Sequence, residues 1–173
     1  MTPPLLGFAL FVCVGIVATS EPAGAQKRPA PVAELSVGWA GFPDDGDMVS
    51  EGVIGATVRW YVRPRLSVGP EVAYVSGRNH RHVMLTGNIT WDVLAASNDR
   101  PRPVTPFVTV GAGLFQTRGT FFGDAVVSRE GAFTAGGGVR AAIGQRATAG
   151  AEARVGWETH LRLTGFIGVR LGQ

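Results

Sequence analysis

The sequence has little charge, almost no lysine and a single cysteine. Only 17% of its 173 residues are charged, compared with about 25% in ordinary soluble domains. Lys27 is the one lysine among 16 basic residues, and the arginines are scattered, so no basic patch for nucleic acid stands out. The mild net charge of +3 and the many aliphatic residues also exclude a disordered charged tail.

Long hydrophobic runs are absent after the N-terminus. The apolar run from Leu5 to Ala18 contains the single cysteine, Cys13, and it is shorter than the roughly 20 residues of a membrane-spanning helix. Small residues at Ala23-Gly24-Ala25 follow it, which is the pattern of a signal-peptide cleavage site. We therefore predict an export signal at residues 1–25 and one mature domain at residues 26–173, which has no cysteine for a disulfide.

The mature chain does contain a regular alternation of apolar and polar residues. Near the C-terminus, for example, Leu163, Ile167 and Val169 share one face of an extended segment, while Arg162 and Arg170 share the other. Glycine makes up 25 of 173 residues, which argues against long helices. Eight alternating segments of about 10–12 residues are longer than typical soluble strands and match tilted membrane-spanning strands. The expected strands are Ala33–Phe42, Gly52–Val62, Leu66–Ser76, His82–Leu94, Val104–Gln116, Ala132–Ile143, Ala147–Trp157 and Leu161–Leu171.

The connections between these segments suggest which side of a membrane each one faces. An even number of strands with both termini on one side is typical of bacterial outer-membrane barrels. The longest connection, residues 117–131, then belongs with 43–51, 77–81 and 158–160 on the outer side. The sequence thus predicts an all-β fold, an eight-stranded antiparallel up-and-down transmembrane β-barrel.

Two hairpins separated by 81 residues are related in sequence. Gly55, Val58, Arg59, Arg65, Gly69 and Glu71 match Gly136, Val139, Arg140, Arg146, Gly150 and Glu152. A three-residue turn in the first hairpin pairs Val62 with Leu66 and places a glycine opposite each repeated arginine, leaving room for its guanidinium group. Arg59 is then diagonal to Glu71 and Arg140 to Glu152, at about 7–8 Å, which long side chains can bridge.

The polar faces are predicted to fill the barrel with paired charges. Eight strands enclose an interior only wide enough for side chains, and buried charges need partners. An open diffusion pore is therefore not expected. The predicted lumen network consists of Arg59, Glu71, Asp92, Arg140, Glu152, Arg154, Arg162 and Arg170.

All four tryptophans have the apolar parity and lie near strand ends. Trp39 and Trp157 are expected at the outer rim, and Trp60 and Trp91 at the inner rim. This placement matches the aromatic girdles of outer-membrane barrels. The alternative is a soluble fold in which the tryptophans and the aliphatic faces point inward.

Two segments carry a resemblance to a known family. Phe133–Arg140, followed by Arg146 and Gly150–Arg154, resembles the final hairpin of the small outer-membrane β-barrels, and Pro106–Leu114 resembles their Pro-aromatic-Val strand. That family includes the barrel domain of outer-membrane protein A and its short relatives. The resemblance implies a bacterial outer-membrane location and contact with outer-membrane lipids and the barrel-insertion machinery.

The histidines are the candidates for chemistry in the outer loops. His80, His82 and His160 would form a metal site if they met, or a catalytic triad with Ser76 and an acid such as Asp124 or Glu158. No nucleophile motif surrounds Ser76, however, and we expect the three histidines to lie in solvated loops. We predict no catalytic residue, no metal site and no cofactor.

The predicted outer loops also contain a group of aspartates and a pair of phenylalanines. The first predicted loop holds Asp44, Asp45 and Asp47, which would bind Ca²⁺ only weakly because their spacing is not that of a complete calcium loop. Phe121 and Phe122 form an apolar pair in the longest loop, which we expect to fold over the barrel mouth.

The sequence therefore predicts a non-enzymatic outer-membrane barrel with a filled polar lumen. Its role would be to stabilise the membrane or to interact with a surface ligand through its outer loops. Three alternatives are a narrow gated channel, a histidine-dependent lipid-modifying enzyme and a soluble ligand-binding barrel.

Overall fold

The computed structural model describes residues 30–44, 47–77, 80–94, 103–121, 124–156 and 160–172. These residues form strands and turns, and they include no helix long and apolar enough to cross a membrane. The strands are β1 (Val32–Asp44), β2 (Asp47–Arg63), β3 (Leu66–Ser76), β4 (His80–Asp92), β5 (Val104–Phe121), β6 (Asp124–Ile143), β7 (Ala147–Gly156) and β8 (His160–Arg170).

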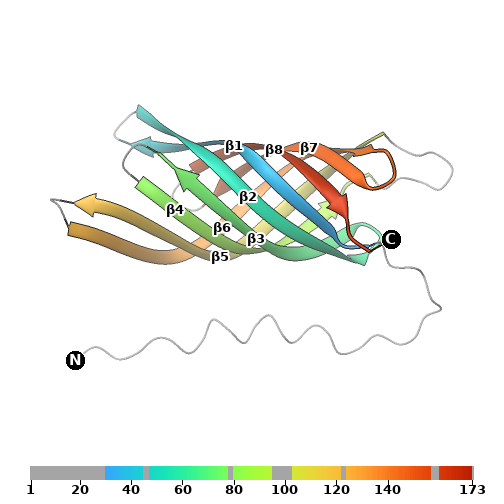
Figure 1. Ribbon diagram of the computed structural model, residues 1–173, viewed down its shortest axis with the longest axis horizontal. Coiled ribbons are helices and arrows are strands. Elements are labelled where there is room, and N and C mark those ends of the chain that lie inside the picture. Colours follow the sequence, from blue (N-terminus) through green and yellow to red (C-terminus); the bar gives the residue numbers. More distant parts are fainter. Residues whose placement is uncertain are drawn as a thin grey trace, which may run out of the picture.

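The eight strands close into one barrel in sequence order (Figure 1). Every neighbouring pair is antiparallel, and β1 closes the barrel against β8 from Val32 opposite Arg170 to Gly41 opposite Leu161. Because Val32 begins the first strand and Arg170 ends the last, both lie at the same end of the barrel. The predicted eight-stranded antiparallel barrel is confirmed.

The alternating apolar and polar residues of the strands form an apolar exterior and a mixed interior. Leu35 and Ile167 point outward and are 63% and 65% exposed. Arg59, Glu71 and Arg154 have the opposite parity and are buried. An exposed belt of aliphatic side chains matches the lipid-facing surface of a transmembrane barrel. This orientation excludes the soluble barrel with an apolar cavity.

Two of the predicted loops are wrong, because their residues continue the strands. The β1–β2 ladder runs on to Asp44 opposite Asp47, and the β5–β6 ladder runs on to Phe121 opposite Asp124. The β5–β6 hairpin extends beyond the rest of the barrel at the end away from the C-terminus (Figure 1). Outside the bilayer neither face of a strand has to be apolar, so the alternation fades while the hydrogen-bond ladder continues.

The first repeated hairpin contains an irregularity that the repeat did not predict. Thr57 pairs with Glu71 as expected, but the register shifts between Tyr61 and Arg63, so that Arg63 faces Leu66 in place of Val62. A β-bulge of this kind adds one residue to one strand. The second hairpin lacks it: Ile143 pairs with Ala147 across a turn in which Gly144 has a φ of +66°.

The glycine opposite Arg59 has a different role from the predicted one. A Cβ added to Gly69 would collide with the backbone carbonyl of Val58, not with the guanidinium group. Glycine is therefore needed here because the two strands approach closely.

Candidate functional site

The lumen is the candidate site, and it is filled at three levels. We call them the inner cluster (Glu34, Arg59, Tyr61, Asp92 and Arg140), the middle cluster (Glu71, Asn88, Glu152, Arg154 and Arg162) and the outer ring layer (Phe42, His82, Phe115 and His160). The inner cluster lies nearest the end that holds Val32 and Arg170. The outer ring layer lies toward the opposite end.

In the inner cluster, Tyr61 joins two ion pairs. Arg59 donates from Nε to Glu34 Oε2 at 2.8 Å and also contacts Oε1 through Nη2. Arg140 Nη2 lies 3.4 Å from Asp92 Oδ1. The Tyr61 hydroxyl accepts from Nη1 of Arg59 (3.4 Å) and of Arg140 (3.2 Å), and it donates to Asp92 Oδ2 (3.3 Å). One hydroxyl thus holds both arginines in a single network.

Arg140 has an aromatic contact in addition to its carboxylate. Its guanidinium carbon lies 4.2 Å from the centre of the Phe107 ring, at a distance typical of a cation–π interaction. Phe107 in turn meets Phe166 edge-on, with 6.1 Å between ring centres. These rings fill the space beside the inner cluster, so the charges are enclosed by apolar surface.

The middle cluster joins opposite walls of the barrel. Glu71 on β3 accepts from Arg154 on β7 at 2.7 Å and from Arg162 on β8 at 2.6 Å. In the strand order β3 and β7 lie four strands apart, so these bonds cross the lumen. Asn88 donates to Glu71 (2.9 Å) and accepts from Arg154 (3.1 Å). The cluster therefore spans the lumen at this level.

A second carboxylate completes the middle cluster. Glu152 accepts from Nη2 of Arg154 at 2.9 Å and lies 3.7 Å from Arg162 Nη2. Two carboxylates therefore face two guanidinium groups, so the formal charges of the cluster cancel. The side chain of Glu71 is only 5% exposed, and such burial is tolerable only because each charge has partners.

The predicted diagonal pairs are wrong, although each residue faces the lumen. Arg59 binds Glu34 on β1, and Arg140 binds Asp92 on β4, so neither binds the glutamate of its own hairpin. The lumen is narrow enough that an arginine reaches carboxylates on several strands. The strand register within one hairpin therefore does not determine which carboxylate an arginine of that hairpin binds.

Two members of the inner cluster were missed. Glu34 and Tyr61 share the parity of the lumen side chains on their strands, and that parity is the signal that could have identified them. Arg170, in contrast, was predicted to belong to the lumen network and does not. Its side chain is exposed at the end of β8, and it has no ion-pair partner among the described residues.

The outer ring layer is aromatic. Phe42 stacks on His82 and on His160, with 5.3 Å between ring centres in each case. Phe115 completes the layer at 5.1 Å from His82 and 6.4 Å from His160. Nearly fully buried apolar side chains surround these rings, namely Ala40, Val53, Ala73, Val75 and Met84.

His82 and His160 are thus not in solvated loops, which corrects the prediction for these two residues. His82 Nδ1 lies 3.0 Å from Thr117 Oγ1, and His82 Nε2 lies 3.6 Å from Glu51 Oε2. His160 is also buried. Both rings are part of the packing that fills the barrel.

The proposed Ser–His arrangement does not form between Ser76 and His82. His82 pairs with Val75 and faces the lumen, whereas Ser76 has the outward parity and pairs with Arg81. Within the part of the chain that the structure describes, no three His, Cys, Asp or Glu residues are grouped to hold a metal ion. Asp45, Phe122 and Glu158 lie outside the described residues, as do the side chains of Asp44, His80, Phe121 and Asp124.

Three of the four tryptophans can be placed. Trp60 and Trp91 point outward near the end that holds Val32 and are 45% and 50% exposed. Trp39 also points outward, half-buried between Gly52 and Leu163 in the register. Trp157 lies outside the described residues. The outer girdle remains a prediction.

A closed eight-stranded barrel with an apolar exterior and a polar, ion-paired interior defines a transmembrane β-barrel. Residues 9–166 match the model of the outer membrane protein β-barrel domain, and the chain belongs to this family. It is accordingly a bacterial outer-membrane protein. No curated protein matches the chain.

Solved structures with the same fold share little sequence with this chain. Neisserial surface protein A is 10% identical at a TM-score of 0.70, over 82% of this chain and 97% of its own. The N-terminal barrel of Pseudomonas aeruginosa OprF is 8% identical at 0.66, over 83% and 98%. Ail of Yersinia pestis is 11% identical at 0.61, over 83% and 99%. At these identities the likeness shows the fold alone.

Proposed function

We propose that this protein is a non-enzymatic outer-membrane barrel with a closed lumen that stabilises the membrane. The observation that carries this proposal is the bonding of Glu71 to Arg154 and Arg162 across the barrel. Such crossing bonds hold the walls together and leave the interior packed. The described histidines support a packing role and not a catalytic one, because aromatic rings stack on both.

A narrow gated channel is the less favoured alternative. Ions could pass the middle cluster only if its buried pairs separated, and an uncompensated buried charge costs several kcal/mol. The outer ring layer would have to separate as well. Two barriers of different chemistry in series make spontaneous opening rare.

The test of the proposed role is outer-membrane permeability in the source bacterium. A strain lacking the gene is expected to take up more of a hydrophobic fluorescent dye, and the wild-type gene is expected to restore the barrier. A barrel in which Glu71 is replaced by Ala should restore it less well at equal abundance. Unchanged dye uptake in the deletion strain would contradict the proposal.

A second candidate function is binding of an anionic surface ligand by the β5–β6 hairpin. Arg118 and Arg129 are exposed there, and the pairs Gln116–Arg129 and Arg118–Val127 place both arginines on one face. Ail has also been solved with the heparin analogue sucrose octasulfate, and that structure is 13% identical to this chain at a TM-score of 0.57.

Sucrose octasulfate is the probe for this second function. The purified barrel is expected to bind it in detergent, and replacing Arg118 and Arg129 by Gln should weaken binding by about tenfold or more. Equal binding by the double variant would exclude the hairpin as the site.

A further inference from the structure

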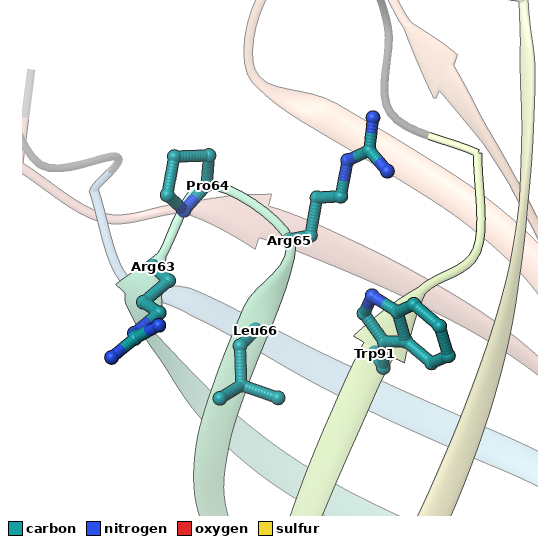
Figure 2. Close-up of a pocket in the computed structure, with 5 residues that line it drawn as sticks. All are labelled: Arg63, Pro64, Arg65, Leu66 and Trp91. Atoms are coloured by element: carbon teal, nitrogen blue, oxygen red, sulfur yellow. The ribbon is translucent and has the colours of Figure 1, made fainter.

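A hollow lies on the outer wall of the barrel, separate from the lumen. It has a volume of about 470 Å³ and is lined by Arg63, Pro64, Arg65, Leu66 and Trp91 (Figure 2). Figure 2 shows Leu66 and Trp91 on adjacent strands, with the two guanidinium groups reaching out on different sides of the turn. An apolar floor is therefore flanked by two cations.

The β-bulge in β2 is what brings Arg63 to this wall. With regular pairing Val62 would face Leu66, and Arg63 would take the parity of Arg59 and Tyr61, which point into the lumen. The shifted register instead aligns Arg63, Leu66 and Trp91 in one outward row across three strands. Bulges commonly re-aim a side chain in this way.

The charged side chains that flank this hollow are both positive. Arg63 and Arg65 are exposed and form no ion pair with any residue that the structure describes. Among the described residues, the acids at this end of the barrel, Glu34 and Asp92, face the lumen and already pair with Arg59 and Arg140. The hollow therefore presents positive charge that no carboxylate of the described residues neutralises.

The position of the hollow relative to the bilayer follows from its neighbours. Trp91 continues the apolar exterior formed by Val108 and Leu66, and it is 50% exposed. Tryptophan concentrates where acyl chains meet headgroups. The β2–β3 turn lies at the end that holds Val32, and short turns at that end are periplasmic in bacterial barrels. The hollow therefore lies at the headgroup level of the periplasmic leaflet.

We propose that this hollow binds an anionic phospholipid of the periplasmic leaflet. Arg65, which lies on the side of the turn nearer Trp91, holds the phosphate, since a guanidinium group forms paired, charge-assisted hydrogen bonds with it. Arg63 adds positive charge from the other side of the turn. Leu66 and Trp91 contact the glycerol and the first part of the acyl chains. Arg146 occupies the matching turn of the repeated hairpin, where Ala147 and Val169 take the places of Leu66 and Trp91 in the register. That turn offers a cation without the aromatic floor.

The test uses the full chain folded in detergent micelles and short-chain phosphatidylglycerol. Bound lipid is measured by native mass spectrometry, and a heat-dependent gel shift verifies the fold of each variant. Two arginines at roughly 1 kcal/mol each predict about 30-fold weaker binding for the R63Q/R65Q double variant and about fivefold for R65Q. R146Q is the matched control and should bind phosphatidylglycerol like the wild type.

Comparison ligands separate a lipid from a phosphate ion. Phosphatidylcholine of the same chain length is expected to bind more weakly than phosphatidylglycerol, and inorganic phosphate should not displace bound lipid at equal concentration. Equal loss in R65Q and R146Q, equal binding of both lipids, or displacement by phosphate alone would each overturn the proposal. Should the double variant fail to fold, the comparison of lipid binding by R65Q and R146Q still tests the proposal.

Discussion

The two ends of the lumen are filled with side chains of different chemistry. Toward the end that holds Val32, five charged or hydroxyl side chains form the inner cluster, and the middle cluster above it pairs two carboxylates with two guanidinium groups. Toward the opposite end, four rings and small aliphatic side chains pack against one another. The comparison shows that a barrel interior can be filled either by neutralising charge or by close packing. The two kinds of filling should respond differently to substitution.

The largest effect is expected from removing the carboxylate at the centre of the middle cluster. Glu71→Ala leaves Glu152 as the one carboxylate bound to Arg154 and Arg162 among the described residues, and breaking a buried ion pair costs about 3–5 kcal/mol in the free energy of unfolding. Urea titration in detergent, followed by tryptophan fluorescence, measures this change. Glu130→Ala on the exposed hairpin is the control, with an expected change within about 0.5 kcal/mol. A loss below about 1 kcal/mol for Glu71→Ala would mean that the crossing bonds do not hold the walls together.

A smaller effect is expected in the inner cluster from Tyr61→Phe. This change keeps the ring but removes the hydroxyl that joins Arg59, Arg140 and Asp92. The expected loss is about 1–2 kcal/mol in the free energy of unfolding, since Asp92 loses a donor in a buried site. The same titration measures it. Both arginines retain their carboxylates, so a loss equal to that of Glu71→Ala would contradict this ranking.

The outer ring layer should tolerate a conservative change better than either cluster. Phe115→Leu removes the stacking on His82 and His160 but keeps an apolar side chain in the gap. About 1 kcal/mol is expected, because aromatic pairs contribute about 0.5–1.5 kcal/mol beyond their buried area. Apolar packing has no charge to screen, so this loss should be the same in low and high salt. A strongly salt-dependent loss would show that the histidines act there as charges.

The smallest effect is expected from Arg170→Gln at the end of β8. Arg170 is exposed and lies outside the described ion pairs, so its replacement should change the free energy of unfolding by less than about 0.5 kcal/mol. Thermal unfolding in detergent, compared with Arg162→Gln in the middle cluster, measures this difference. A large effect at Arg170 would place it in the network after all.

The sequence predicts which side chains face the lumen but not which of them bind one another, and the reason is physical. Alternation assigns Glu152 and Arg154 to the lumen face of their strand, and that is where they lie. The partner of each charge could not be predicted, because it depends on which side chains from opposite walls reach the axis. Arg59 pairing with Glu34 is an example.

The outer ring layer was not visible in the sequence at all. Phe42 and Phe115 have the lumen parity, but an apolar residue on a polar face gives no signal of its own unless its neighbours in space are known. The bulge that turns Arg63 outward was hidden for a similar reason. It depends on one unpaired residue, and the repeated hairpin does not share it.

Planar-bilayer recording shows whether the lumen of the folded barrel is closed to ions. The purified protein is incorporated into a bilayer at physiological salt, and a Glu71→Ala, Phe115→Ala double variant serves as the comparison. We expect no unitary current steps from the wild type at moderate voltage, and steps or leak from the variant, in which both barriers are weakened. Regular unitary steps from the wild type would contradict the closed lumen and identify the protein as a channel.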